Sequence, residues 1–334
     1  MHAEDRELRW RRIPVRAVAR LKHRLEYAGF LAALGLNRLV GDDAAARVGE
    51  TIGRLGYPLG LRRDVVERNL RIAFPERDAA WIARVARASY AHFGRELLVM
   101  LRLSLATREE VIERTVIDGA DPAIRDYHDG RGVVVVAGHF GNWELGAAAY
   151  TARGYEIDAI AKRASNPLFY QHILDARQRL GLRVIDMRGA SRQALRSLSA
   201  GRGLALVADQ YTGRMSVPVP FFGRPTPMLR APAVLALRSG APMYICLPAR
   251  LPDGRYHARL ERIDTSTTDD AEGDVARITA DWAAHLEAAV REYPEQYLWH
   301  HRRWRDRPAG PVHASVRPSE SPAPAEEPEP PAAV

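Results

Sequence analysis

The stretch VVVVAGHFGNWELGAAA, residues 133–149, joins an apolar run to a polar segment through two glycines. Four consecutive valines, followed by alanine and then glycine, are typical of a strand that is buried on both faces of a sheet. Asn142 is a good helix N-cap, so a helix is expected to follow it. A strand, a tight turn and a helix in this order predict one unit of an α/β fold, with His139 at the carboxyl end of the strand.

The chain after this stretch continues the alternation of strands and helices. Apolar runs rich in β-branched residues predict strands, and the periodic stretches between them predict helices. The expected strands are VVVVA (133–137), EIDAIA (156–161), RVIDM (183–187), GLALVA (203–208), MYICLPA (243–249) and YHARLER (256–262), and the expected helices include 166–181, 191–201 and 270–293. We therefore expect an α/β fold with a central, mostly parallel sheet flanked by helices.

The chain before this stretch carries helical patterns, so a helical N-terminal region is expected ahead of the α/β core. Residues 42–103 predict helices, with Asp42 as the first N-cap and with breaks near Pro58 and at residues 74–76. The predicted organisation has three parts: a basic amphipathic helix (1–40), a main domain (41–308, helical over 41–115 and α/β over 116–308), and a disordered tail rich in proline and glutamate (309–334).

The composition is basic and almost free of lysine. The chain has 334 residues and a formal net charge of +8, and Lys22 and Lys162 are the only lysines. Arginine forks suit phosphate or carboxylate groups. Nucleic-acid binding is a general interpretation of such charge, but no recognition motif accompanies it, so no nucleic-acid partner is expected. The single cysteine, Cys246, excludes an internal disulfide, fits a reducing cytoplasm and is expected to be buried.

The first 24 residues carry eight arginines and lysines against three acidic residues. A basic stripe at i, i+4 spacing runs beside an apolar one: Arg16, Arg20 and Arg24 next to Ala17, Leu21 and Leu25. Two interpretations stand, an amphipathic helix packed on its own domain or an interfacial helix that docks on anionic lipid. No segment has the ~18 uncharged apolar residues of a transmembrane helix, and no secretory signal is expected. The protein is therefore expected in the cytoplasm, or on a membrane surface.

The polar residues after the valine run suggest a catalytic pair. On one continuous helix His139 and Glu144 would point about 140° apart, but Gly138 and Gly141 allow a tight turn between strand and helix. Glu144 is then expected to reach back, orient the imidazole and raise its basicity. Two alternatives remain: a structural hydrogen-bonded pair, or metal ligands, although the stretch has no third ligand. Trp143 is expected to pack in the core.

These residues also resemble a known family. AGHFGNWE (137–144) resembles the His-x4-Asp/Glu motif of glycerolipid acyltransferases, and looks most like the branch that contains the bacterial lipid A biosynthesis lauroyl and myristoyl acyltransferases. Related enzymes of that branch acylate phosphatidylinositol mannosides. Further segments resemble family motifs in the same order, so that the resemblance covers about residues 30–308: NLRIAFPE (69–76), AKRASNP (161–167), VADQYTG (207–213) with VPFFGRPT (219–226), and PEQYLWHHRRWRDRP (294–308).

The resemblance implies an O-acyltransferase on the cytoplasmic face of the inner membrane, held there peripherally. It would move a fatty acyl chain from acyl carrier protein or coenzyme A to a hydroxyl of a membrane lipid, with the thioester as co-substrate and no other cofactor. A lipid A precursor is the expected acceptor; a phosphatidylinositol mannoside or a lysophospholipid is the alternative. The expected partners are the membrane lipid acceptor, acyl carrier protein or acyl-CoA, and an anionic membrane surface. Two other classes are a non-catalytic lipid- or phosphate-binding protein and a metallohydrolase.

The resemblance assigns catalysis to His139 as base and to Glu144 as its support. It assigns substrate binding to polar residues of the later motifs: Lys162, Arg163, Asn166, Asp209, Arg302 and Arg303. Lys162 is favoured over Arg163 as donor to the oxyanion, although the family uses arginine. Arg302 and Arg303 would bind phosphate or form a solvated basic patch. Some family members carry a second acid two residues after the position of Asp209, where this chain has Tyr211.

Overall fold

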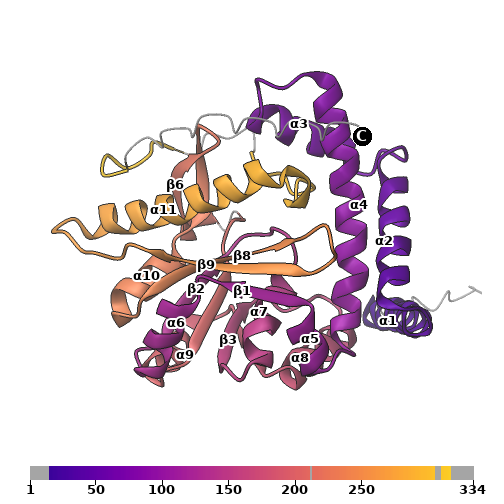
Figure 1. The fold of residues 1–334 in the computed structure, drawn as a ribbon, viewed down its shortest axis with the longest axis horizontal. Coiled ribbons are helices and arrows are strands. Elements are labelled where there is room, and N and C mark those ends of the chain that lie inside the picture. The colour runs from indigo at the N-terminus through magenta and orange to yellow at the C-terminus, as the bar shows by residue number, and fades with distance from the viewer. Residues whose placement is uncertain (1–14, 211–212, 305–309, 317–334) are drawn as a thin grey trace, which may run out of the picture.

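The computed structural model describes residues 15–210, 213–304 and 310–316 (Figure 1). A seven-stranded sheet forms the centre of the described chain: β1 (Thr115–Asp118), β2 (Val133–Ala137), β3 (Ile157–Ala161), β4 (Leu182–Asp186), β5 (Gly203–Val207), β8 (Met243–Arg250) and β9 (Tyr256–Ile263). The strand order is β1-β9-β8-β2-β5-β3-β4, and every neighbouring pair is parallel except β8 and β9. This confirms the predicted mostly parallel α/β sheet and all six predicted strands.

Helices cover both faces of this sheet. One face packs against α9 (Ala190–Ser199), α10 (Ala231–Ser239) and α11 (Ala271–Glu292). The opposite face packs against α6 (Asp121–His128) and α7 (Trp143–Ala152). Helix α8 (Pro167–Arg179) packs beside β4. Successive side chains of a strand point to opposite faces, so the four valines of β2 divide. Val134 and Val136 are fully buried in the core with α9, α10 and α11, while Val133 and Val135 face α6 and α7.

The N-terminal region is helical, as the patterns predict. It contains α1 (Val15–Leu39), α2 (Asp42–Gly56), α3 (Arg63–Ala73), α4 (Ala79–Leu103) and α5 (Arg108–Glu113), with breaks at Pro58 and after Ala73. The N-cap of α2 is Gly41; Asp42 lies in the first turn, where its carboxylate pairs with Arg102 and Arg114. The pairing of Asp42 with these two arginines replaces the expected capping hydrogen bond.

Glycines hold α2 against α4. A Cβ on Gly53 would lie 2.1 Å from the carbonyl oxygen of Tyr90, and one on Gly94 would lie 2.2 Å from the carbonyl oxygen of Gly49. The two helix backbones therefore touch. This close packing fixes α4, which carries residues that reach the catalytic turn.

Some elements were not predicted. β1 is only four residues long, and the hairpin of β6 (Ser216–Phe221) and β7 (Arg224–Leu229) has prolines at positions 218, 220, 225 and 227. Proline cannot donate to a ladder, so such runs argue against a central strand. The hairpin tolerates them because it forms a separate two-stranded sheet, in which Pro218 pairs with Pro227 and Pro220 with Pro225.

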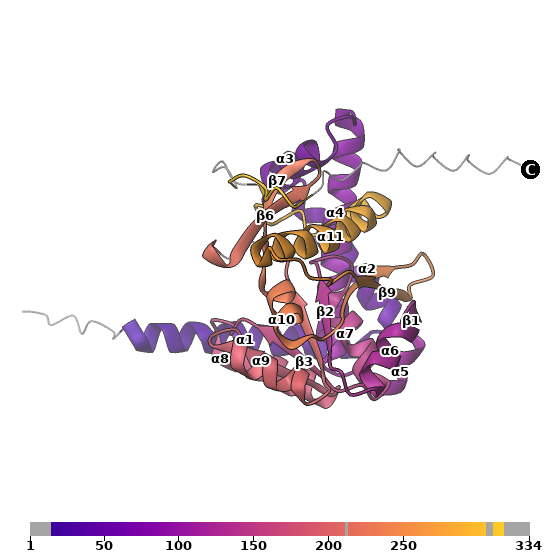
Figure 2. The ribbon, with the colours of Figure 1, turned by 90° about the vertical axis from the view of Figure 1, so that its left-hand side faces the viewer.

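Both ends of the described chain contact the core. Helix α1 runs beside α8 and projects past it (Figure 2), and the side-chain amide of Asn166 donates to the carbonyl oxygen of His23 at 2.9 Å. The predicted tail begins at residue 309, yet Ser315 donates to the carbonyl oxygen of Gly273 at the start of α11, at 2.9 Å. Residues 1–14 and 317–334 lie outside the described residues. No helix of the described chain is long and apolar enough to cross a membrane.

Candidate active site

His139 and Asp209 meet because their strands are neighbours in register. Ala137 of β2 pairs with Val207 of β5, and each polar residue stands two positions beyond this pair. His139 Nδ1 lies 2.6 Å from Asp209 Oδ1. The Asp209 side chain is only 2% exposed, whereas the His139 side chain is 20% exposed. The carboxyl edge of the sheet thus holds a buried acid behind a partly accessible imidazole.

The contacts of the imidazole define its tautomer. A carboxylate only accepts hydrogen bonds, so Nδ1 carries the proton that is donated to Asp209. The side-chain amide nitrogen of Gln210 lies 3.2 Å from His139 Nε2, and because an amide NH2 only donates, Nε2 accepts. In this tautomer Nε2 is the ring atom that can accept a proton, as a general base must.

Asp209 is held in its charged form. Burial by itself would raise the pKa of this carboxyl, but the charge and hydrogen bond of His139, the charge of Arg303 and the hydroxyl of Tyr297 lower the pKa to about 2. The Tyr297 hydroxyl donates to Asp209 Oδ2 at 3.0 Å. Each oxygen of the carboxylate therefore has a partner, which fixes its orientation toward the imidazole.

Arg303 lies inside the protein and not on a basic surface patch. It is 3% exposed, donates to the carbonyl oxygen of Pro227 at 3.0 Å and stacks over the ring of Phe221 at 5.6 Å. Burial lowers the pKa of this guanidinium, and the neighbouring Tyr297 and Asp209 act in the opposite direction. The predicted contact with a surface phosphate does not fit this position; Arg303 instead supports the charge of Asp209. Arg302 is exposed.

Glu144 has a different partner from the one expected. Its Oε2 accepts from Nε of Arg177 at 3.0 Å, and its other oxygen accepts from Nη2 of the same arginine. The expected contact with the imidazole is replaced by that of Asp209, since β5 brings this acid directly to Nδ1. Glu144 and His139 still line the same cavity.

The turn between β2 and α7 requires its glycine and its asparagine. Gly141 has φ +53°, and a Cβ there would lie 1.8 Å from the carbonyl oxygen of Pro248. Asn142 is the predicted N-cap: its Oδ1 accepts from the Leu145 amide at 2.9 Å. Its Nδ2 donates at 2.8 Å to the buried carboxylate of Glu96 on α4. The helix thus begins at a fixed point beside His139.

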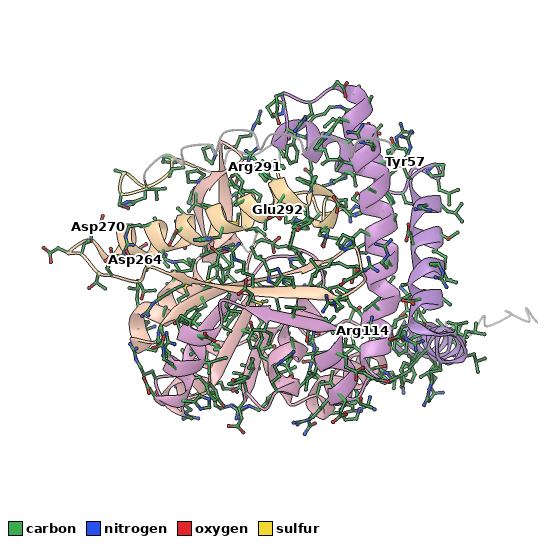
Figure 3. The ribbon with its side chains drawn as sticks, viewed as in Figure 1. Tyr57, Arg114, Asp264, Asp270, Arg291 and Glu292 are labelled. Carbon is green, nitrogen blue, oxygen red and sulfur yellow. The ribbon has the colours of Figure 1, made fainter. Side chains whose placement is uncertain are left out.

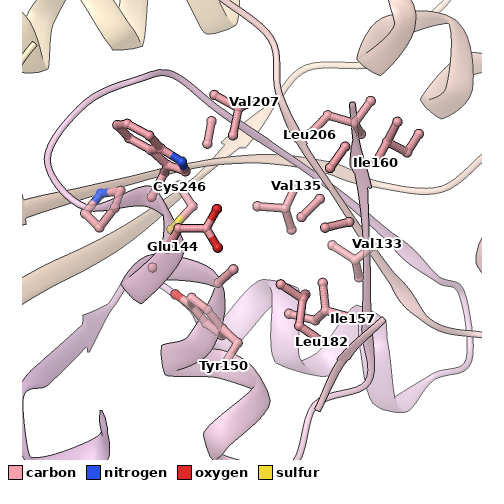
Figure 4. A pocket seen from close by; sticks show the side chains of 18 of the residues that line it. Val133, Val135, Glu144, Tyr150, Ile157, Ile160, Leu182, Leu206, Val207 and Cys246 are labelled. Carbon is pink, nitrogen blue, oxygen red and sulfur yellow. The ribbon is translucent and has the colours of Figure 1, made fainter. Parts of the chain in front are cut away.

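A cavity of about 600 Å³ opens beside the imidazole (Figure 4). Aliphatic and aromatic side chains from β2, β3, β5 and α7 line most of it, and Figure 4 shows the carboxylate of Glu144 facing them. The polar lining residues are His139, Glu144, Lys162, Arg177 and Gln210. The prediction that Trp143 packs in the core is wrong: its ring borders this cavity and lies 4.9 Å from the imidazole.

The remaining predicted residues separate into lining and structural positions. Lys162 is exposed and lines the cavity. Arg163 is turned toward Asp186, at 3.8 Å, and toward the ring of Tyr170. Asn166 is a buried N-cap of α8 that accepts from Leu168 N at 3.1 Å, so its amide is engaged within the protein.

Sequence reasoning missed three polar residues of the site: Gln210, Tyr297 and Arg177. Gln210 follows Asp209 at the end of β5, and this adjacency was the available signal. Tyr297 belongs to a C-terminal segment in which Leu298 N donates to His139 O at 3.0 Å. Nothing local in the sequence links Arg177 to Glu144, which lies 33 positions away.

Comparison with known proteins identifies the family of the chain. The model of the family "bacterial lipid A biosynthesis acyltransferase" matches residues 17–306. The chain belongs to this family. It is therefore an acyltransferase that acts on lipid, as the sequence motifs predict.

Several named proteins resemble the chain along most of their length. A phosphatidylinositol mannoside acyltransferase of Mycolicibacterium smegmatis is 29% identical, over 74% of this chain and 79% of its own length. One of Mycobacterium tuberculosis is 27% identical, over 82% and 84%. The lipid A biosynthesis lauroyltransferase of Escherichia coli is 28% identical, over 79% and 86%.

Proposed function

We propose that this acyltransferase moves a fatty acyl chain from the thioester of acyl carrier protein or coenzyme A to a hydroxyl of a membrane glycolipid. The observation that carries the proposal is the position of His139, which borders a largely apolar cavity while Asp209 holds its Nδ1. A base next to an apolar cavity suits a reaction between a hydroxyl and an acyl chain. The glycolipid is a lipid A precursor or a phosphatidylinositol mannoside.

The reaction needs one general base, and no cofactor besides the thioester co-substrate. His139 Nε2 takes the proton of the acceptor hydroxyl as its oxygen attacks the thioester carbonyl carbon. The tetrahedral intermediate collapses, the carbon–sulfur bond breaks, and the imidazolium returns the proton to the departing thiolate. Asp209 stabilises the imidazolium in between through the 2.6 Å contact with Nδ1. The acceptor hydroxyl would occupy the position of the Gln210 amide, which contacts His139 Nε2 in this structure.

The negative oxygen of the intermediate requires a donor. Lys162 lines the cavity with His139, and Arg163 points elsewhere, so we assign this role to Lys162. Removal of one such donor typically costs about 100- to 1,000-fold in turnover. Glu144 and Arg177 form the opposite side of the polar opening, where a bidentate pair can orient the acceptor.

The acyl chain would lie along β2. Lining residues extend from Ala137, next to His139, to Val133 at the start of the strand, about 13 Å at the usual rise per residue. Tyr127 and Tyr155 stand at the far end, with ring centroids 5.3 Å apart. Cys246 also borders the cavity, but burial raises the pKa of its thiol to about 12, so no thiolate is present to form an acyl-enzyme.

The membrane contact would involve more than the first helix. Leu21 and Leu25 of α1 are 59% and 65% exposed, as an interfacial helix requires. Helix α2 and the turn after it add an apolar stripe at i, i+4, i+7 and i+11 with exposed fractions of 48%, 60%, 57% and 71%: Val48, Ile52, Leu55 and Leu59. These surfaces would hold the enzyme on the anionic cytoplasmic face of the inner membrane, without nucleic acid as a partner.

Lipid mass spectrometry of a deletion strain tests the proposal. The membrane glycolipid that loses one acyl chain is the acceptor, and complementation with the wild-type gene should restore it. Complementation with a His139→Ala gene should not. A deletion strain in which every membrane lipid keeps its acyl chains, or restoration by His139→Ala, would contradict the proposed function.

A further inference from the structure

A second large cavity lies beside α4. It has a volume of about 900 Å³ and is lined by α2, α4, the end of β8 and the segment after α11. Figure 3 labels Tyr57, one of its lining residues, at the end of α2, and Glu292, the last residue of α11, just before the lining residues Tyr293 and Glu295. None of the predicted site residues lines it.

This cavity is rich in positive charge. Five arginines line it against two carboxylates: Arg54, Arg63, Arg87, Arg95 and Arg250 against Glu50 and Glu295. Glu50 pairs with both Arg54 and Arg95, which lowers its own pKa against the effect of burial. Arg87 has no ion-pair partner among the described residues and stacks over the ring of Tyr57 at 4.9 Å. The lining therefore offers guanidinium groups to an anion.

Buried polar groups stand at the inner wall of the cavity. His92 is 7% exposed and lines it, and within the described part of the chain its Nε2 has no hydrogen-bond partner. Glu96 lies behind His92, where its Oε1 is 3.8 Å from His92 Nδ1 and 4.0 Å from Arg250 Nε. His92 therefore presents a polar ring atom at the boundary between this cavity and the smaller one beside it.

A narrow cavity borders both these residues and the active site. It has a volume of about 140 Å³; it shares His92 and Gln296 with the arginine-lined cavity, and His139 and Trp143 with the acyl cavity. Its other side chains are mostly apolar, including Phe93, Leu97 and Met100. A thin substrate arm could extend from the arginines to Nε2 of His139.

We propose that the arginine-lined cavity binds a phosphate group of one of the two substrates, whose reacting end reaches His139 through the narrow cavity. The inference rests on the proposed acyl-transfer function, because both substrates of that reaction can carry phosphate: the phosphopantetheine arm of the donor and the head group of a phosphoglycolipid acceptor. Arginine binds phosphate through two parallel hydrogen bonds, and an unpaired group such as Arg87 is free to do so.

Matched soluble probes distinguish the two sources. Isothermal titration calorimetry would compare 4′-phosphopantetheine with pantetheine, and inositol 1-phosphate with inositol, on the full chain. The variants are Arg87→Glu and Arg250→Gln, with Arg84→Glu as control, an exposed arginine of the same helix outside the cavity lining. Arg87 is exposed, so this variant keeps the test valid if Arg250→Gln fails to fold.

If the cavity binds phosphate, one phosphorylated probe should bind the wild type more tightly than its dephosphorylated partner. Both cavity variants should lower the affinity for that probe about 10- to 100-fold. Arg84→Glu should stay within about twofold. If the cavity variants bind 4′-phosphopantetheine more weakly than the wild type does, the cavity belongs to the donor. If they bind inositol 1-phosphate more weakly, it belongs to the acceptor. Equal affinity for both members of each pair, no binding at all, or equal losses in the control variant would overturn the proposal.

These affinities do not require turnover. If His139→Ala kept full acyl transfer, the proposed function would be wrong, but the affinity ratios of phosphorylated to dephosphorylated probes would remain valid evidence for the phosphate site. If the ratios failed and His139→Ala were inactive, only the phosphate site would be lost.

Discussion

Replacement of Asp209 by asparagine is the sharpest test of the site. The substitution keeps the shape of the side chain and removes its charge. The pKa of Asp209 is lowered from 3.8 to about 2, which corresponds to about 2 kcal/mol of net stabilisation of the carboxylate. His139 is the first of the groups that supply it. Loss of the charge should therefore slow proton transfer, because the imidazolium that forms at His139 loses its neighbouring carboxylate.

The amide adds a second effect on the tautomer. An asparagine can turn its NH2 toward Nδ1, and the imidazole proton then moves to Nε2, where the lone pair of the base is lost. We expect the two effects together to lower kcat/KM by about 100- to 10,000-fold, the range of positioned proton transfer. Asp209→Asn also leaves the buried Arg303 without its neighbouring charge, so thermal unfolding must be measured and activity compared where both proteins are folded.

Acyl-transfer kinetics of single and double variants make the test decisive. Because Asp209 acts through His139, adding Asp209→Asn to His139→Ala should have little further effect. Glu144→Gln is the control. The Glu144 carboxylate pairs with Arg177, so Glu144→Gln and Arg177→Gln should lower activity by similar factors. Near-wild-type activity of Asp209→Asn would refute the reasoning. So would a cycle in which Glu144, and not Asp209, is coupled to His139.

Five further variants test other parts of the structure. Burial lowers the pKa of His300 from 6.5 to about 4, so the unfolded chain binds its proton first; unfolding curves should show stability falling as pH drops from 6.5 to 4, by up to about 3 kcal/mol, and His300→Phe should remove this slope. Gly141→Ala should abolish the folded enzyme in thermal unfolding, because its Cβ would strike a carbonyl oxygen, while Gly154→Ala, with φ +96° but open space, should cost only about 1–3 kcal/mol. Ala205→Phe places a ring in the acyl cavity, so competition between donors of different length should shift toward shorter chains; an unchanged preference would mean that the chain lies elsewhere. Leu25→Asp should weaken sedimentation with anionic vesicles, and equal binding by variant and wild type would remove α1 from the membrane contact.

The local parts of this site could be predicted from the sequence. The valine run, Gly141 and Asn142 specify a strand, a tight turn and a capped helix, and the structure has all three. These features depend on propensities of residues next to each other in the chain. His139 at the end of the strand follows from them directly.

The partners of His139 and Glu144 could not be predicted in the same way. The order of strands decides that β5, and not β3, lies next to β2, and no local pattern encodes that order. Asp209 reaches the imidazole for this reason alone. Arg177 reaches Glu144 because α8 packs beside the same edge, which is again a matter of tertiary arrangement.

The valine run explains why the base can be rigid beside an open cavity. Val134 and Val136 are fully buried against α9, α10 and α11, so one face of β2 is fixed by dense packing. Val133 and Val135 line the acyl cavity on the other face, together with side chains of α6 and α7. A strand supported on both sides would leave no room for a chain, and one supported on neither would not hold His139 within hydrogen-bond distance of Asp209. The alternation of side chains lets one short strand meet both requirements, since the packed face preorganises the imidazole that the open face presents to substrate.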